Sequence, residues 1–255
     1  RQDIGPAPQG AGPLASAGTR QGRGGDATKM WPVALLLCDL DDTLADRRSL
    51  FAAWAQSYLR RIGQDPAELT WLTEQDANGY TPRPEFFRRV IERFSPDEPL
   101  EAFEERYHDE YIRSFRCEAE VIDALGRARR AGLRIAIVTN GQTRAQGGKV
   151  GAAALADLVD ACCISEAEGY WKPAPELFRI AAERCNEPLD GAWMVGDNPV
   201  TDVGGAAALG LSTVWIRLGR TWPHDLDYAP TREADTFPEA VDAVLAQMAV
   251  TGDGV

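Results

Sequence analysis

The sequence lacks any apolar run that is long enough to cross a membrane. The longest apolar stretch near its start covers residues 33–38, far short of the roughly 20 residues that a spanning helix needs. This stretch leads directly into Asp39, which also excludes it as the apolar core of a signal peptide. We therefore expect no membrane-spanning segment and no membrane as a partner.

Zinc ligands and paired cysteines are scarce as well. The two histidines, His108 and His224, are far apart and neither lies near a cysteine cluster, so a zinc site is not expected. The five cysteines form an odd number without a CxxC pair, which does not favour a disulfide framework. These features indicate reduced thiols and predict a cytoplasmic protein.

Positive charge is in short supply, because 27 Lys and Arg face 39 Asp and Glu, for a formal net charge of −12. Proteins that bind nucleic acid gather Lys and Arg against its phosphates, so we do not expect nucleic acid as a partner. The overall field also repels an anionic substrate, which must then be bound by a local group of cations.

The distribution of apolar residues predicts the fold. Residues 1–29 are rich in Gly, Ala, Pro, Gln and Arg without apolar periodicity, which predicts a disordered N-terminal tail. Continuous apolar runs, typical of strands buried on both faces, occur at residues 33–37, 133–138, 161–164, 192–195 and 212–216. Helical patterns lie at residues 118–131, 144–158, 175–185, 200–209 and 237–248. This alternation predicts an α/β fold with a doubly wound parallel sheet.

Residues 46–116 differ, because they contain no strand-like run. Aromatic and aliphatic residues recur there at helical spacing, as Trp54, Tyr58 and Ile62 do. We expect an all-helical insert of about four helices at residues 46–116, within an α/β core formed by residues 30–45 and 117–250.

Polar side chains come after four of the expected strands, at or soon after the point where each strand ends. They are Asp39, Asp41, Thr139, Asn140, Lys172, Asp197 and Asp202. Ligands of open α/β sheets bind outside the carboxyl ends of the strands. We therefore expect these side chains to converge on one edge of the sheet.

This set of side chains has the parts that phosphate chemistry needs. A carboxylate such as Asp39 can attack phosphorus and form an acyl phosphate, which divides one difficult displacement into two easier ones. Two carboxylates ~4 Å apart repel each other by about 4 kcal/mol at an effective dielectric near 20, so a pair of Asp39 and Asp197 needs a hard cation such as Mg²⁺. Lys172 and Thr139 can bind phosphoryl oxygens. Asp41 could protonate the leaving oxygen and later activate water.

Four motifs resemble those of the haloacid dehalogenase (HAD) superfamily of phosphatases, and they stand in the family's order. They read Cys38-Asp39-Leu40-Asp41-Asp42-Thr43-Leu44, Val138-Thr139-Asn140-Gly141, Lys172-Pro173-Ala174-Pro175-Glu176-Leu177-Phe178 and Val195-Gly196-Asp197-Asn198-Pro199-Val200-Thr201-Asp202. The resemblance extends from about residue 30 to about residue 248. It implies a Rossmann-like core with a helical cap of the compact C1 type (subfamily I), formed by the insert.

The resemblance also implies roles for the site residues. Asp39 would be the nucleophile and a Mg²⁺ ligand, and Asp41 the general acid/base and a ligand through its backbone carbonyl. Asp197 would bind the metal, with Asp202 supporting it or ligating. Thr139, Asn140 and Lys172 would bind the phosphoryl group. The implied activity is Mg²⁺-dependent hydrolysis of a small phosphorylated metabolite, a phosphate monoester, through an aspartyl-phosphate.

Other functions stay open at this point. A phosphomutase of the same superfamily differs in cap residues, and product analysis would separate it from a phosphatase. A 2-haloacid dehalogenase attacks carbon without a metal and lacks an acid at the position of Asp41, so Asp41 argues against it. A signalling receiver domain carries its acceptor Asp after the third strand, where this chain has Ile164-Ser165. A non-catalytic scaffold is disfavoured by the intact set of polar residues.

Several basic residues could belong to the site but are better explained otherwise. Arg47, Arg48 and Arg83 lie where a lid could meet substrate, but solvated surface positions are favoured for each. Gly148-Lys149 is similar to part of a P-loop, but Val150 stands where Ser or Thr is required, so no phosphate-binding role is expected. The particular monoester and the oligomeric state remain open.

Overall fold

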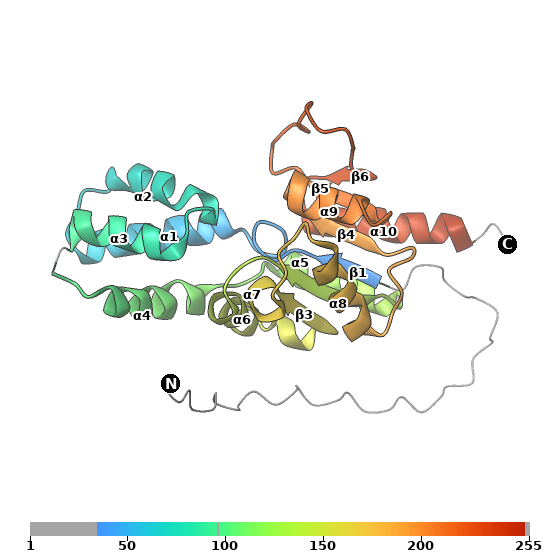
Figure 1. The fold of residues 1–255 in the computed structure, drawn as a ribbon, viewed down its shortest axis with the longest axis horizontal. Coiled ribbons are helices and arrows are strands. Elements are labelled where there is room, and N and C mark those ends of the chain that lie inside the picture. Colours follow the sequence, from blue (N-terminus) through green and yellow to red (C-terminus); the bar gives the residue numbers. More distant parts are fainter. Residues whose placement is uncertain (1–34, 96, 253–255) are drawn as a thin grey trace, which may run out of the picture. The chain divides into compact units, whose positions relative to one another are not determined.

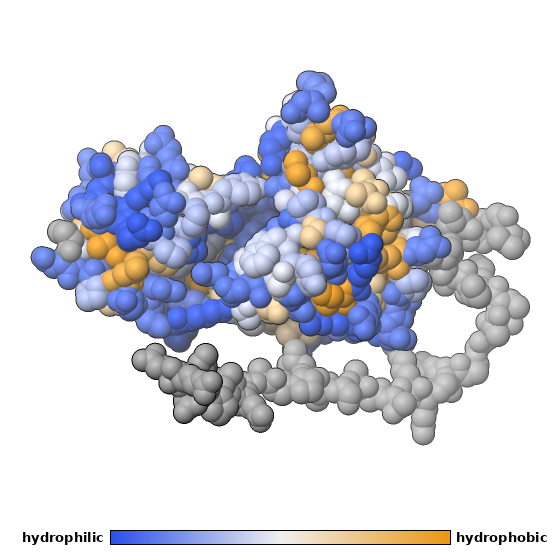
Figure 2. Space-filling view, viewed as in Figure 1, coloured by the Kyte–Doolittle hydropathy of each residue, from blue (hydrophilic) through white to orange (hydrophobic). Residues whose placement is uncertain are grey.

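The computed structural model describes residues 35–95 and 97–252. The tail expected at residues 1–29 lies outside these described residues. Within them, no helix is long and apolar enough to cross a membrane. Figure 2 shows hydrophilic side chains over most of the face seen in that view, with apolar side chains in scattered groups.

A six-stranded parallel sheet forms the centre of the described chain (Figure 1). Its strands follow the order β3-β2-β1-β4-β5-β6, with bounds β1 (Leu35–Cys38), β2 (Arg134–Thr139), β3 (Ala161–Ile164), β4 (Trp193–Gly196), β5 (Ser212–Ile216) and β6 (Arg232–Ala234). Five of these strands were expected, and the doubly wound α/β fold is confirmed. The sixth was missed because it is three residues long and two of them, Arg232 and Glu233, are exposed.

Helices cover both faces of the sheet. Alternate residues of a strand point to opposite faces. Accordingly, Leu36 and Cys38 pack in the same apolar cluster as α5 (Ala119–Arg130) and α10 (Phe237–Gly252). Leu35 and Leu37 pack on the opposite side, with residues of α8 (Pro175–Cys185). Burial on both faces explains why β1 is apolar throughout.

Two expected helices are shorter than their apolar patterns. The helix expected at 144–158 is α6 (Thr143–Ala152), followed by a 3₁₀ turn at Leu155–Asp157, because Ala154 takes a left-handed conformation with φ 53°. The helix expected at 200–209 is a π-helical turn, Pro199–Gly204, which continues into α9 (Gly205–Ala207). A further short helix, α7 (Ser165–Glu168), follows β3.

Between β1 and β2, the described residues form helices without a strand. These are α1 (Arg47–Arg61), α2 (Glu68–Asp76), α3 (Arg83–Phe94) and α4 (Leu100–Glu110), with 3₁₀ turns at Ala77–Gly79 and Ile112–Ser114. Aromatic rings hold the helices together. Trp54 of α1 stacks on Tyr58 at 5.4 Å between ring centroids, and it meets Tyr107 of α4 edge to face at 4.8 Å. Such pairs stabilise a packed interface beyond the area that they bury.

Candidate active site

The order of the strands determines where the site lies. After β3 the chain returns to the other side of β1, so β1 has β2 on one side and β4 on the other. This change of direction leaves a crevice at the carboxyl ends of the central strands, where open α/β sheets bind ligands. Asp39 directly follows β1 and Asp197 directly follows β4. The two are held in register because the Asp39 N–H donates to the Val195 carbonyl at 3.0 Å.

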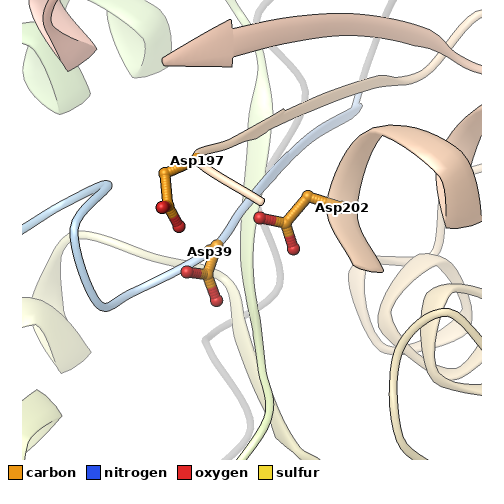
Figure 3. Close-up of side chains that lie close together, drawn as sticks. All are labelled: Asp39, Asp197 and Asp202. Carbon is orange, nitrogen blue, oxygen red and sulfur yellow. The ribbon is translucent and has the colours of Figure 1, made fainter. Parts of the chain in front are cut away.

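Three of the predicted residues form a compact carboxylate cluster. Asp39, Asp197 and Asp202 each offer one oxygen, and these oxygens all lie within 4.8 Å of one another (Figure 3). All three residues are buried. Asp39 and Asp197 lie one residue beyond β1 and β4, and Asp202 lies in the π-helical turn that follows β4. Asp39 and Asp197 are more than 150 residues apart in the sequence, and the pairing of β1 with β4 brings them together.

Burial and the nearby negative charges make Asp39 and Asp197 costly to ionise. Burial raises the pKa of Asp197 to about 7, and the charges of Asp202 and Asp42 add to the effect. Burial also raises the pKa of Asp39, an effect that Lys172 opposes and the neighbouring carboxylates reinforce. A bound cation would relieve this repulsion, and a cluster made of carboxylate oxygens is the donor set that Mg²⁺ prefers. The residues present therefore fit the ion that the sequence predicts.

Lys172 lies against this cluster. Its Nζ donates to Asp39 Oδ1 and to Asp202 Oδ1, each at 2.7 Å. Burial alone would lower the pKa of the ammonium, but the two carboxylates outweigh burial and the pKa is raised. Lys172 is therefore a fixed positive charge beside the predicted nucleophile.

Asn140 fixes the backbone of Lys172. Its Oδ1 accepts from the Lys172 N–H at 2.8 Å, and its Nδ2 donates to the Lys172 carbonyl at 2.9 Å. Asn140 was predicted to bind the phosphoryl group. In the structure its side-chain amide joins the loop after β2 to the loop that carries Lys172, and the role in phosphoryl binding stays a prediction.

Asp202 is held from two sides. Its Oδ1 accepts from Lys172, and its Oδ2 accepts from the Asn198 N–H at 2.9 Å. Gly196 leaves room for this carboxylate, because a Cβ at that position would overlap with it. A glycine before Asp197 is therefore required by packing against Asp202.

Asp41 lies apart from the three clustered carboxylates and has its own partners on α6. Lys149 Nζ donates to both carboxylate oxygens at 2.7 Å. Gln146 Nε2 donates to Asp41 Oδ2 at 3.0 Å and to Thr139 Oγ1 at 2.6 Å. Burial by itself would raise the pKa of Asp41, but Lys149 and Arg47 outweigh it and the pKa is lowered. Asp41 is thus ionised and oriented by α6.

Sequence reasoning missed two residues of α6 and misplaced two of the insert. Lys149 and Gln146 are buried beside Asp41. Their spacing of three places them on one face of the helix after Thr139, and this spacing could have predicted that both side chains face the site. The surface positions expected for Arg47 and Arg83 were wrong. Arg47 is 5% exposed, and both residues line the pocket. Arg48 is exposed, as expected, and pairs with Asp42.

A pocket of about 540 Å³ lies over these side chains and is lined by residues of the core and of the insert. Two of the hydrogen bonds between the insert and the site come from the segment after α2. Asn78 Nδ2 donates to Asp42 Oδ2 at 2.8 Å, and Asn198 Nδ2 donates to the Tyr80 hydroxyl at 2.6 Å. The volume is in the range of small-molecule sites.

Comparison with known proteins gives the family. A family model for haloacid dehalogenase-like hydrolases matches residues 33–210, and the chain belongs to this family of hydrolases. A phosphoserine phosphatase of Thermus thermophilus is 34% identical over 179 residues, which are 70% of this chain and 62% of that protein. The chain thus spans less than two thirds of this relative's length. A glyceraldehyde 3-phosphate phosphatase of Pyrococcus furiosus is 26% identical over 77% of this chain and 85% of the relative.

Solved structures of the superfamily share the fold. A HAD phosphatase from Thermococcus onnurineus matches with a TM-score of 0.59 and 23% identity, over 83% of this chain and 97% of that one. An L-2-haloacid dehalogenase from Xanthobacter autotrophicus matches with a TM-score of 0.64 and 17% identity, over 84% of this chain and 98% of that one. Because a phosphatase and a dehalogenase both have this fold, the reaction must be argued from the side chains of the site.

Proposed function

We propose that the chain is a Mg²⁺-dependent phosphatase that hydrolyses a small phosphate monoester through an aspartyl-phosphate on Asp39. The observation that carries this proposal is the convergence of Asp39, Lys172 and Asp197 at one sheet edge, with a separately oriented Asp41 beside them. A dehalogenase has no use for an acid at position 41, whereas hydrolysis of a phosphate monoester gains from an acid that protonates the leaving alkoxide oxygen.

The first step is attack of an Asp39 carboxylate oxygen on phosphorus. A bond forms between that oxygen and phosphorus, and the ester P–O bond breaks. The leaving oxygen takes a proton from the carboxylic acid form of Asp41. Lys172 offers its positive charge to the phosphoryl oxygens, and the Thr139 hydroxyl can donate a hydrogen bond to them.

The second step returns the enzyme to its starting state. The carboxylate of Asp41 accepts a proton from water, whose oxygen attacks phosphorus. The bond between phosphorus and Asp39 then breaks, which releases inorganic phosphate. The lowered pKa of Asp41 suits this step, because the ionised form is the base.

Asp39, Asp197, Asp202 and the backbone carbonyl of Asp41 would hold Mg²⁺, whose positive charge offsets that of the carboxylates and of the phosphoryl oxygens. Asp202 would bind the ion while its carboxylate also accepts hydrogen bonds from Lys172 and from the Asn198 N–H. The pocket over the site suits a small phosphorylated metabolite.

The test is phosphate release from p-nitrophenyl phosphate and from a panel of metabolite monoesters, with Mg²⁺ and with EDTA. Asp39→Asn should lower kcat by roughly 10⁴- to 10⁶-fold, as loss of a nucleophile does in other hydrolases. Asp46→Asn is the matched control. It makes the same chemical change at an exposed residue outside the pocket, and Asn can still cap α1. An acid-quenched reaction should leave a phosphoryl group on the protein that hydroxylamine removes.

Release that persists in EDTA or in Asp39→Asn would contradict the proposed mechanism. Conversion of a sugar phosphate into its isomer without release of phosphate would identify a phosphomutase instead. Release of halide from a 2-haloacid would identify a dehalogenase.

A further inference from the structure

The side of the pocket formed by the insert carries two arginines that share one carboxylate. Arg47 donates to both oxygens of Asp76 at 2.8 and 2.9 Å, and Arg83 Nη1 lies 2.8 Å from Asp76 Oδ1. Asp76 is 1% exposed and also accepts from the Gly79 N–H. Its charge is therefore divided between two guanidinium groups, both of which line the pocket.

Counting charges shows that this side of the pocket is cationic. The cations Arg47, Arg83 and Lys149 face two carboxylates, Asp76 and Asp41, and Lys149 already pairs with Asp41. These three cations share two carboxylates, which leaves a formal surplus of one positive charge among the five side chains. A buried charge is costly unless it is paired, so an anionic ligand placed here would gain from the surplus.

A buried hydroxyl adds hydrogen-bonding capacity at the same place. Tyr111 lines the pocket, and its hydroxyl is buried without a hydrogen-bond partner among the described residues. Burial raises the pKa of Tyr111 well above its usual range, so it stays neutral and can donate. The hydroxyl of Tyr107 already receives a hydrogen bond from Arg83 at 3.4 Å.

The other side of the pocket has the opposite balance, because the carboxylates of Asp39, Asp197 and Asp202 outnumber their two cationic partners. Lys172 pairs with Asp39 and Asp202, and Arg220 donates to Asp197 Oδ2 at 3.0 Å. Under the proposed function that side receives the phosphoryl group and its cation. The leaving group of the ester then extends toward Arg47 and Arg83.

We propose that the leaving group of the substrate carries a second acidic oxygen group, a carboxylate or another phosphate, which pairs with Arg83 and Arg47. This inference rests on the proposed function and narrows its substrate class. Guanidinium groups match the planar geometry of a carboxylate or the oxygens of a phosphate. A net charge of −12 would otherwise repel a multiply charged substrate, which makes a local pair of arginines more useful.

Matched pairs of monoesters test the proposal by kcat/KM. Phosphoglycolate is compared with ethyl phosphate, and 3-phosphoglycerate with glycerol 3-phosphate, so that each pair differs mainly in a carboxylate. Propane-1,3-diyl bisphosphate and 3-hydroxypropyl phosphate form the arm for a second phosphate. The acidic member of at least one pair should be favoured about 10- to 100-fold, the range for a hydrogen bond between charged groups. The favoured arm identifies the acidic group.

Arg83→Gln should reduce that preference about tenfold or more, and Arg83→Lys should restore part of it, because Lys keeps the charge without the planar geometry. The matched control is Arg88→Gln on the exposed face of α3, outside the pocket, which should leave the preference unchanged. The preference is a ratio of two kcat/KM values measured on the same protein, so a lower amount of folded protein does not change it.

Equal kcat/KM within every pair, or a preference that survives in Arg83→Gln, would overturn the inference while leaving the phosphatase proposal intact. Absence of phosphate release from every ester, acidic or neutral, would instead count against the proposed function itself.

Discussion

At the scale of single residues, the pairing of Asp41 with Lys149 decides which form of the acid/base residue prevails. Lys149 is buried, and its Nζ contacts both oxygens of Asp41. Gln146 ties the same carboxylate to Thr139. The proposed first step needs the protonated form of Asp41 and the second step needs the ionised form. Lys149 favours the ionised form, and it also fixes the direction of the carboxylate.

Lys149→Met should lower kcat, because Asp41 loses the partner that orients and charges it. Asp41→Asn alone should lower kcat by about 10²- to 10⁴-fold, the range for loss of a general acid–base group. The loss in Lys149→Met should be smaller. Steady-state kinetics on the best ester of the panel measures both.

A double-mutant cycle shows whether Lys149 acts through Asp41. In the Asp41→Asn background, Lys149→Met should have little further effect on kcat, since residues that work as a unit give non-additive losses. Fully additive losses would show that Lys149 contributes by another route, and the positioning role would then be wrong.

At the scale of elements, the insert depends on a polar centre as well as on its aromatic core. Asp76 ends α2, Arg47 begins α1 and Arg83 begins α3. One carboxylate thus joins three helices and the turn at Gly79, where a Cβ would press on the Arg47 guanidinium. The loop that carries Asn78 and Tyr80 toward the core is built on this centre.

Asp76→Ala should destabilise the protein by about 3 kcal/mol or more, because it leaves two guanidinium groups without their buried partner. Asp76→Asn should cost less, since its oxygen can still accept from the Gly79 N–H. Urea unfolding followed by circular dichroism measures the free energy of unfolding. Glu68→Gln is the matched control, because its pair with Arg93 is on the surface and surface ion pairs contribute little. Equal losses in Asp76→Ala and Glu68→Gln would contradict this account.

The elements also show how much was predictable from the sequence. Strands β1 to β5 could be predicted because burial on both faces demands continuous apolar runs. Asp39, Thr139 and Asp197 could be predicted because they stand where such runs end. The positions of Arg47 and Arg83 at the pocket could not be predicted. Helical periodicity indicates which face of a helix is apolar, but it does not indicate that an arginine of that helix pairs with Asp76. The π-helical turn after β4 could not be predicted either, because it depends on the hydrogen bonds that the Asn198 side chain accepts.

At the scale of the whole molecule, net charge and the carboxylate cluster act in the same direction on metal binding. The chain is acidic overall, and the field that repels an anionic substrate attracts a divalent cation. The pKa of Asp197 is raised to about 7, so protons compete with the metal for this site near neutral pH. Stability, pH and Mg²⁺ should therefore be linked.

The sign of this linkage follows from the raised pKa. Folded protein holds a proton on Asp197 up to about pH 7, whereas the unfolded chain releases it near the ordinary value of 3.8. The contribution of Asp197 to stability is therefore fully present below about pH 4 and is lost as the pH rises toward 7. Asp197→Asn removes this titration, so in EDTA the variant should be more stable than the wild type above about pH 7.

Mg²⁺ should reverse the loss, because it binds the ionised carboxylates of the folded state. We expect the increase in Tm on adding Mg²⁺ to be small near pH 5, to grow up to about pH 7 to 8, and then to level off. At a concentration of about 100 Kd the ion would add about 2.7 kcal/mol to the free energy of unfolding. Thermal unfolding at a series of pH values, with Mg²⁺ or EDTA, measures the increase, and Ca²⁺-free buffers keep other ions from masking it. Asp197→Asn should show little increase at any pH. An increase in the wild type that is the same at pH 5 and pH 8 would mean that these carboxylates do not gate the binding of the metal.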